Sequence, residues 1–453
     1  MINYRHVLEE IPDYQEFLTV AELDASSQEL AFRYPEKVKL HVIGHSRKGH
    51  PIYCLKIGDG ERRVLSFACP HPNEPIGAMT LEYFARKLAE DEAFLKATGC
   101  TWYLIKCVDP DGTKLNEGWF KGPFTLRNYA EHYYRPAMHQ QVEWTFPVDY
   151  KQLHFDAPIP ETQALMKLID EIKPDFMYSL HNAGFGGVFW YISKDQPEIY
   201  TRLGAIPGEY GLPLALGEPE MPCCINYAPA VYKMLSVEDM YDFYEKYVCP
   251  DPSGFIGSGA SSDGYANRVG ETLTLVCELP YFYNSQVDDQ TVTQMSRKEA
   301  MLKSCETAEH CCRFLKTQMD RICDVIPEDN PFRMMIYNLV EMMGGDSEGK
   351  KAMIRENPEF ERLALACEVF DNLYGNTFNW MTFTGLLVHM IREERKKQAK
   401  LPQCLEDAYA AGMKELDAMD ACLAEHVEYE VIPIKTLISI QLSCAFTALN
   451  YMK

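Results

Sequence analysis

A histidine and a glutamate, His71 and Glu74, stand three residues apart where one apolar run of the sequence ends and another begins. A second histidine, His181, closes a further apolar run, and the glycine-rich stretch after it permits close approach of the backbone. Two neutral imidazoles and one carboxylate suit Zn²⁺ at about 2.0–2.2 Å and leave a fourth position for water. Each residue alone is more typical of a polar turn or a structural hydrogen bond. Together they indicate a catalytic metal site.

Apolar runs that alternate with helical patterns must position these residues. Residues 37–60 alternate apolar and polar side chains around a glycine-containing turn, which is typical of a β-hairpin. This order of elements predicts an α/β fold with a mixed, mainly parallel central sheet flanked by helices. The later patterns predict strands at 63–69, 102–108, 175–181, 187–193 and 271–282 and helices at 77–97 and 160–172.

Three of the predicted strands end at residues that could do chemistry. They are His71 with Glu74, then His181, and finally Glu278. Sheets of this kind bind ligands beyond the carboxyl ends of their strands. We therefore expect these four side chains to meet at one edge of the sheet.

The ordered motifs from about Lys37 to Tyr283 resemble the zinc carboxypeptidases, the family of pancreatic carboxypeptidase A. VIGHSRKGHPIYCLKIG is similar to the opening hairpin of the family, and HPNE is similar to its first pair of ligands. VDPDG (108–112) is similar to the family's N-P-D-G turn, with Asp109 in place of asparagine. YSLHNAG is similar to the strand of the third ligand, and GYANRVGETLTLVCELPYF to the strand that ends in the catalytic glutamate. The order of the motifs makes the resemblance specific.

The resemblance implies a carboxypeptidase-like fold in which His71, Glu74 and His181 bind one zinc ion. It also implies that Glu278 is the general base. Zinc lowers the pKa of a bound water to about 7 and polarises a scissile carbonyl group. A carboxylate beside that water can take its proton and later deliver it to the leaving amine.

The resemblance further implies an arginine that stabilises the oxyanion, between VDPDG and the stretch FPVDYKQLHFDAP. Arg135 is favoured over Arg127 because it lies nearer to that stretch, although either could be an ordinary surface cation. The family places an asparagine–arginine pair for the substrate carboxylate in this stretch, and that pair is missing. Lys151 is the only cation there.

Three further residues are candidates for substrate binding. Asn73 stands where the pancreatic enzymes have an arginine, so one cation is absent from the expected cleft. Asp263 lies near the specificity position of the family and would favour a basic side chain, although a turn is the commoner role of an Asp-Gly pair. Tyr265 corresponds to a tyrosine that precedes the catalytic strand, but its spacing to Glu278 differs.

The patterns divide the chain into three parts. Residues 1–36 form a helical N-terminal segment with one or two short helices, residues 37–294 form the carboxypeptidase-like catalytic domain, and residues 295–453 form an all-helical region apart from a short strand near 429–432. The helical region could cover the cleft, enlarge the core or join copies into a homo-oligomer. Its last apolar segment contains polar residues, which predicts a buried or interface helix and not a membrane span.

Composition limits the partners and the location. The chain has 44 basic and 66 acidic residues and a formal charge of −22, which argues against nucleic acid or anionic membranes as partners. The first residues lack the apolar core of a secretion signal, and 16 cysteines without such a signal fit reduced thiols. We expect a cytoplasmic protein whose partner is a peptide or a small amide substrate.

These observations predict a zinc-dependent hydrolase of a peptide or amide bond, most simply a metallocarboxypeptidase. The missing asparagine–arginine pair favours an alternative: a zinc-dependent deacylase or amidase of small amino-acid derivatives or modified cell-wall peptides. A third hypothesis is a non-catalytic binding protein that assembles through its helical region. The retention of the three ligands and of Glu278 argues against this third hypothesis.

Overall fold

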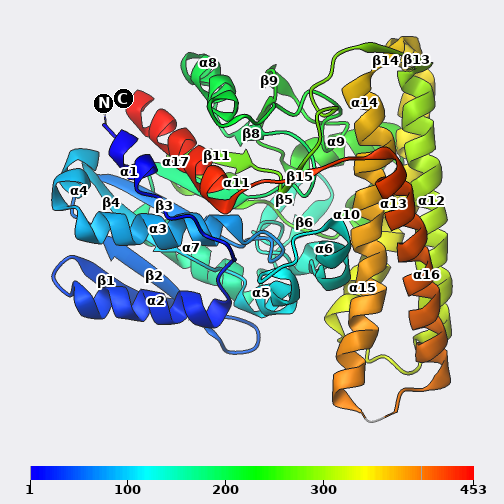
Figure 1. Ribbon diagram of the computed structural model, residues 1–453, viewed down its shortest axis with the longest axis horizontal. Helices are drawn as coiled ribbons and strands as arrows, with labels where there is room; N and C mark the ends of the chain where they lie inside the picture. The colour runs from blue at the N-terminus through cyan, green and yellow to red at the C-terminus, as the bar shows by residue number, and fades with distance from the viewer. Residues whose placement is uncertain (1, 399, 453) are drawn as a thin grey trace.

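The computed structural model describes residues 2–398 and 400–452 and is built around one large sheet (Figure 1). The strands of this nine-stranded sheet lie in the order β1-β2-β4-β3-β7-β11-β8-β10-β9. Strands β4, β3, β7 and β11 run parallel at its centre, with antiparallel neighbours on either side. The predicted mixed sheet with a parallel centre is confirmed. The strands are β1 (Val38–His45), β2 (Pro51–Ile57), β3 (Arg62–Ala68), β4 (Cys100–Ile105), β7 (Phe176–His181), β8 (Phe189–Ile192), β9 (Asn226–Ala228), β10 (Val231–Lys233) and β11 (Leu273–Glu278).

The central strands are buried on both faces, which explains their nearly continuous apolar sequence. In β3, Val64 and Ala68 face a core that they share with the helices α3 and α17. Leu65 and Phe67 of the same strand face the opposite core, which contains α7, α9 and α11. Helices therefore cover the two faces of the sheet. They are α3 (Ile76–Glu90), α7 (Pro160–Ile172), α9 (Val237–Tyr247), α11 (Ser262–Val269) and α17 (Ile434–Tyr451).

The single helix predicted over 77–97 is wrong, because the structure has two helices there, α3 and α4 (Glu92–Thr98). Asp91 separates them, and its side chain accepts a hydrogen bond from the backbone N–H of Phe94. Aspartate is a preferred residue at this position because it satisfies a backbone donor at the start of a helix. The apolar spacing continues across the break, so periodicity does not reveal it.

The N-terminal segment, where one or two short helices were expected, contains the short α1 (Arg5–Glu9) and the longer α2 (Val20–Arg33). Small elements complete the α/β part of the chain between the strands of the sheet. They are α5 (Pro110–Asn116), α6 (Leu126–His132), β5 (Val148–Tyr150), β6 (Leu153–Phe155), α8 (Pro197–Ala205) and α10 (Ser253–Ile256).

Five helices stand together beside the α/β part and are called here the helical group (Figure 1). The C-terminal region is mostly helical, as predicted, but it is not all-helical. Strand β14 (Leu363–Leu365) pairs with β13 (Val292–Ser296), and β15 (Glu430–Val431) pairs with β12 (Phe282–Tyr283). The strand expected near 429–432 is confirmed as β15, whereas β14 was not predicted. The helical group comprises α12 (Arg297–Ile322), α13 (Pro331–Glu356), α14 (Ala366–Phe370), α15 (Asn376–Lys397) and α16 (Gln403–His426).

The last helix, α17, lies outside the helical group and packs on the sheet beside α3 (Figure 1). The hydroxyl of Tyr178 in β7 donates to the backbone oxygen of Gln441 at 2.9 Å, and Thr80 of α3 donates to the side chain of Gln441 at 2.6 Å. The prediction of a buried helix in this segment is confirmed. Within the described residues, no helix combines the length and apolarity needed to cross a membrane.

A buried group of charges joins α3 to the end of β4. The ammonium of Lys106 lies 2.6 Å from a carboxylate oxygen of Glu82, and each side chain is only 4% exposed. The hydroxyl of Ser26 in α2 donates to both oxygens of Glu82, and Arg86 forms a further ion pair with it from the surface side. Because α3 begins directly after the segment that contains His71 and Glu74, this group also anchors the helix that follows the predicted site.

Candidate metal centre

Three adjacent parallel strands bring the predicted metal ligands and Glu278 to one edge of the sheet. His181 and Glu278 are the last residues of β7 and β11 and lie directly opposite each other in register. Strand β3 ends at Ala68 on the other side of β7, and the following turn carries His71 and Glu74 before α3 begins. The edge is the one at which such sheets bind their ligands.

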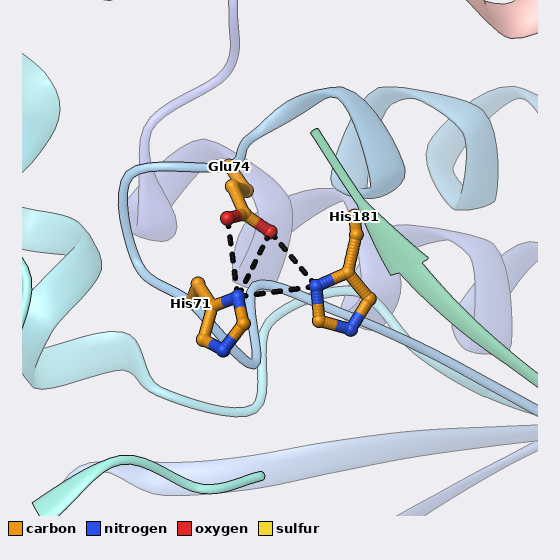
Figure 2. A group of neighbouring side chains, drawn as sticks. All are labelled: His71, Glu74 and His181. Carbon is orange, nitrogen blue, oxygen red and sulfur yellow. Dashed lines mark hydrogen bonds and ion pairs between the residues drawn. The ribbon is translucent and has the colours of Figure 1, made fainter. Parts of the chain in front are cut away.

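The three predicted ligands form a compact triangle (Figure 2). The Nδ1 atom of His71 lies 3.1 Å from the Nδ1 atom of His181 and 3.1 Å from Oε1 of Glu74. The Nδ1 atom of His181 lies 3.0 Å from Oε2 of Glu74. The exposed fractions of His71, Glu74 and His181 are 7%, 2% and 5%, so the group is shielded from solvent.

This triangle fits a zinc ion. In tetrahedral coordination at normal zinc distances, ligand atoms stand roughly 3.4 Å apart. The three spacings between ligand atoms, from 3.0 to 3.1 Å, are close to that value. Imidazole nitrogen binds a metal through its lone pair, so two facing Nδ1 atoms beside one carboxylate suit a shared cation better than shared protons.

A cavity of about 510 Å³ opens over the triangle. Its lining includes Glu278, Arg135 and Asp263 from the α/β part. The opposite wall comes from the helical group and the turn before α15, including Ser304, Lys350, Asp371, Asn376 and Phe378. The C-terminal region therefore forms part of the wall of the cavity.

A protein-family model described as zinc carboxypeptidase matches residues 23–203 of the chain. This match shows similarity to that family over less than half of the chain. The family and the His–Glu–His group together support a zinc-dependent hydrolase.

The solved structures that are similar to this chain include carboxypeptidases. Carboxypeptidase A from Helicoverpa armigera is 16% identical, with 59% of this chain and 66% of that chain covered and a TM-score of 0.40. Bovine thrombin-activatable fibrinolysis inhibitor, in complex with tick carboxypeptidase inhibitor, is 15% identical, with coverages of 58% and 86% and a TM-score of 0.38. A metallo-carboxypeptidase from Pseudomonas aeruginosa, in complex with (2-guanidinoethylmercapto)succinic acid, is 15% identical, with coverages of 74% and 68% and a TM-score of 0.36. The chain thus spans slightly less than two thirds of the first of these structures, and no curated protein sequence matches it.

Behind the candidate metal centre lies a carboxylate that was not predicted from the sequence. Glu143 stands 3.7 Å from Nε2 of His181 and accepts hydrogen bonds from the hydroxyl of Ser179 at 2.7 Å and from the backbone N–H of Ser262 at 2.8 Å. Glu143 is too far from Nε2 of His181 for a direct hydrogen bond, but the hydroxyl of Ser179 lies 2.8 Å from that nitrogen and links the two residues. A carboxylate linked in this way fixes the orientation of a metal-binding imidazole and raises its basicity. Glu143 precedes β5 in an irregular segment, where neither periodicity nor spacing distinguishes it from a surface glutamate.

Glu143→Ala should weaken zinc binding by about 10- to 100-fold, because the imidazole of His181 loses the carboxylate behind it. Competition with a chromogenic chelator measures this change. Asp263→Asn is the matched control, because Asp263 also lines the cavity but accepts its hydrogen bond from Ser261. Equal zinc affinity of the Glu143 variant and the control would show that Glu143 does not position His181.

The structure brings one of the two candidate arginines to the metal centre. Arg135 lines the cavity, with a guanidinium nitrogen 3.4 Å from Oε1 of Glu74 and another donating to Gln141 at 3.1 Å. Arg127 is not brought there. Its position on α6 turns it toward the helical group, where it pairs with Glu131 and with Asp417.

Two of the four candidates for substrate binding line the cavity, and the other two lie away from it. Asn73 and Asp263 line the cavity, where Asn73 donates to the hydroxyl of Tyr129 at 3.1 Å. Burial raises the pKa of Asp263 to about 7. Lys151 does not reach the cavity, because it lies in the turn between β5 and β6 and pairs with two acidic residues of α9, Asp242 and Glu245. Tyr265 also points away from the cavity and donates to Asp170 of α7 at 2.9 Å.

Proposed function

We propose that the protein is a zinc-dependent carboxypeptidase that hydrolyses the last peptide bond of short peptides. The position of Glu278 carries this proposal. Its Oε1 atom lies 3.8 Å from the Nδ1 atom of His181, and it lines the same cavity. A carboxylate beyond the three ligands therefore stands where a proton acceptor for hydrolysis is needed.

The residues of the cavity divide the chemistry among them. Zinc held by His71, Glu74 and His181 would supply an acidic water molecule and polarise the substrate carbonyl. Glu278 takes the proton of the attacking water and passes it to the leaving amine. Burial raises the pKa of Glu278 well above the usual value of a glutamate. Arg135 donates hydrogen bonds to the oxygen on which negative charge develops.

The cavity supports a small substrate. Its volume of about 510 Å³ is that of a site for small ligands, and the helical group closes one side of it. A short peptide or a single amino-acid derivative fits a space of this size.

Removal of the metal tests this function. The purified protein should contain one zinc ion per chain and release the last residue of N-acetylated dipeptides and tripeptides, measured by mass spectrometry. A chelator should abolish the release, and added zinc should restore it.

Matched substrates separate this function from the alternatives. The same peptides as C-terminal amides and a set of N-acyl amino acids serve for comparison. Cleavage of only these compounds would replace the carboxypeptidase by an amidase or deacylase. A protein that neither contains nor takes up zinc would contradict every hydrolase hypothesis of this kind.

A further inference from the structure

We propose that Lys350, on helix α13 of the helical group, binds the carboxylate group of the substrate. This inference rests on the proposed function and assigns a substrate-binding residue to a region of the chain outside the α/β part. The helical group would then do more than cover the cavity. It would select substrates that carry a free carboxylate.

The distribution of charge in the cavity is the first observation. The described residues that line it include two permanently basic side chains, Arg135 and Lys350. A terminal carboxylate in a partly enclosed site requires such a cation, because a charge-assisted hydrogen bond compensates for the lost hydration. Among the described residues of the lining, these two are the permanently basic ones that can provide it.

Arg135 is already engaged beside the metal centre. It contacts Glu74 and donates to Gln141, and the proposed reaction uses it for the oxyanion. Lys350 forms no ion pair with any side chain that the structure describes. The next residue, Lys351, instead pairs with Glu309 and Glu348. A flexible lysine stem lets the ammonium of Lys350 meet a carboxylate within the cavity.

Apart from Glu278, the acidic residues of the lining are bound to donors of the protein itself. Glu218 forms a two-pronged ion pair with Arg297 at 2.6 and 2.9 Å. Asp371 accepts the backbone N–H of Glu218 at 2.8 Å, and Glu220 accepts the hydroxyl of Tyr191 at 2.8 Å. These contacts hold the acids in place, so their number does not make a cation the expected ligand.

A binding experiment tests the proposal without turnover. The zinc-loaded Glu278→Gln protein is titrated by calorimetry with a set of N-acetylated dipeptides and with the same dipeptides as C-terminal amides. The acids should bind more tightly than the amides. Adding Lys350→Ala should weaken binding of the acids by about 10- to 100-fold and leave the amides unchanged.

Two variants serve as controls. Lys350→Arg should restore most of the affinity for the acids, because it keeps the charge, whereas Lys351→Ala on the same helix should change neither affinity. Circular dichroism confirms that each variant is folded. Equal binding of acids and amides before Lys350 is changed, an equal loss for both after the change, or no binding of either set would overturn the proposal. Failure of the proposed function is a separate result, seen as absence of hydrolysis by the protein that retains Glu278.

Discussion

Glu278→Gln is expected to lower kcat for peptide hydrolysis by about 10²- to 10⁴-fold, because an amide cannot accept the proton of the attacking water. The substitution keeps the size of the side chain. Glu278 is the last residue of β11 and lies beside His181 without completing the triangle of ligands. Zinc content should therefore stay at one ion per chain while the chemical step fails. Single-turnover kinetics and metal analysis on the same preparation measure both properties.

The control for this variant is Glu220→Gln, which makes the same chemical change at another glutamate of the cavity lining. Glu220 binds the hydroxyl of Tyr191 and should lose little activity. Activity that survives in Glu278→Gln would remove Glu278 from the reaction. Loss of zinc together with activity would instead make it a ligand.

Glu82→Ala is expected to lower the free energy of unfolding by about 3–5 kcal/mol, because it leaves the buried ammonium of Lys106 without its partner. Burial alone would raise the pKa of Glu82, but the charge of Lys106 beside it holds that pKa below its usual value. The pair is thus ionised in the folded protein. Urea denaturation followed by tryptophan fluorescence measures the loss.

A double variant identifies the cause of this loss. Glu82→Ala combined with Lys106→Met removes both charges and should recover much of the stability, because no unpaired charge remains. Arg86→Ala removes only the outer partner of Glu82. Because the side chain of Arg86 is 30% exposed, this variant should lower the free energy of unfolding far less. A double variant no more stable than Glu82→Ala would show that packing, and not charge, dominates.

The ends of three strands could be predicted from sequence because each joins a strong apolar run to a residue that binds metal or protons. Parallel strands place such ends at one edge of the sheet. The placement of His71, His181 and Glu278 could therefore be predicted without knowing the conformations of the loops. The family resemblance, and not strand geometry, favoured Arg135, which lies in the lining of the cavity. It could not separate Lys151 from the site, because the direction of a turn between two short strands leaves no trace in local composition.

Residues brought to the cavity by distant contacts could not be predicted. Glu143 meets His181 only because an irregular segment crosses behind β7, and Lys350 reaches the cavity only because α13 packs beside the α/β part. Neither residue follows an apolar run that predicts a strand of the central sheet, which was the pattern that identified His181 and Glu278. The break between α3 and α4 at Asp91 was not predicted for a different reason. A capping aspartate can interrupt a helix without disturbing the spacing of its apolar residues.

The position of α17 also has a consequence for how the chain folds during synthesis. Gln441 binds Thr80 and Tyr178, which precede it by 361 and 263 residues, and Leu449 accepts a hydrogen bond from Arg62 across 387 residues. Contacts between segments so far apart in the chain form late, because the intervening loop must first be closed. The apolar face of the sheet that α17 covers stays open until the residues of α17 itself have left the ribosome. A nascent chain with such a face is prone to aggregate, so the yield of this protein in cells should depend on chaperones that hold it during translation.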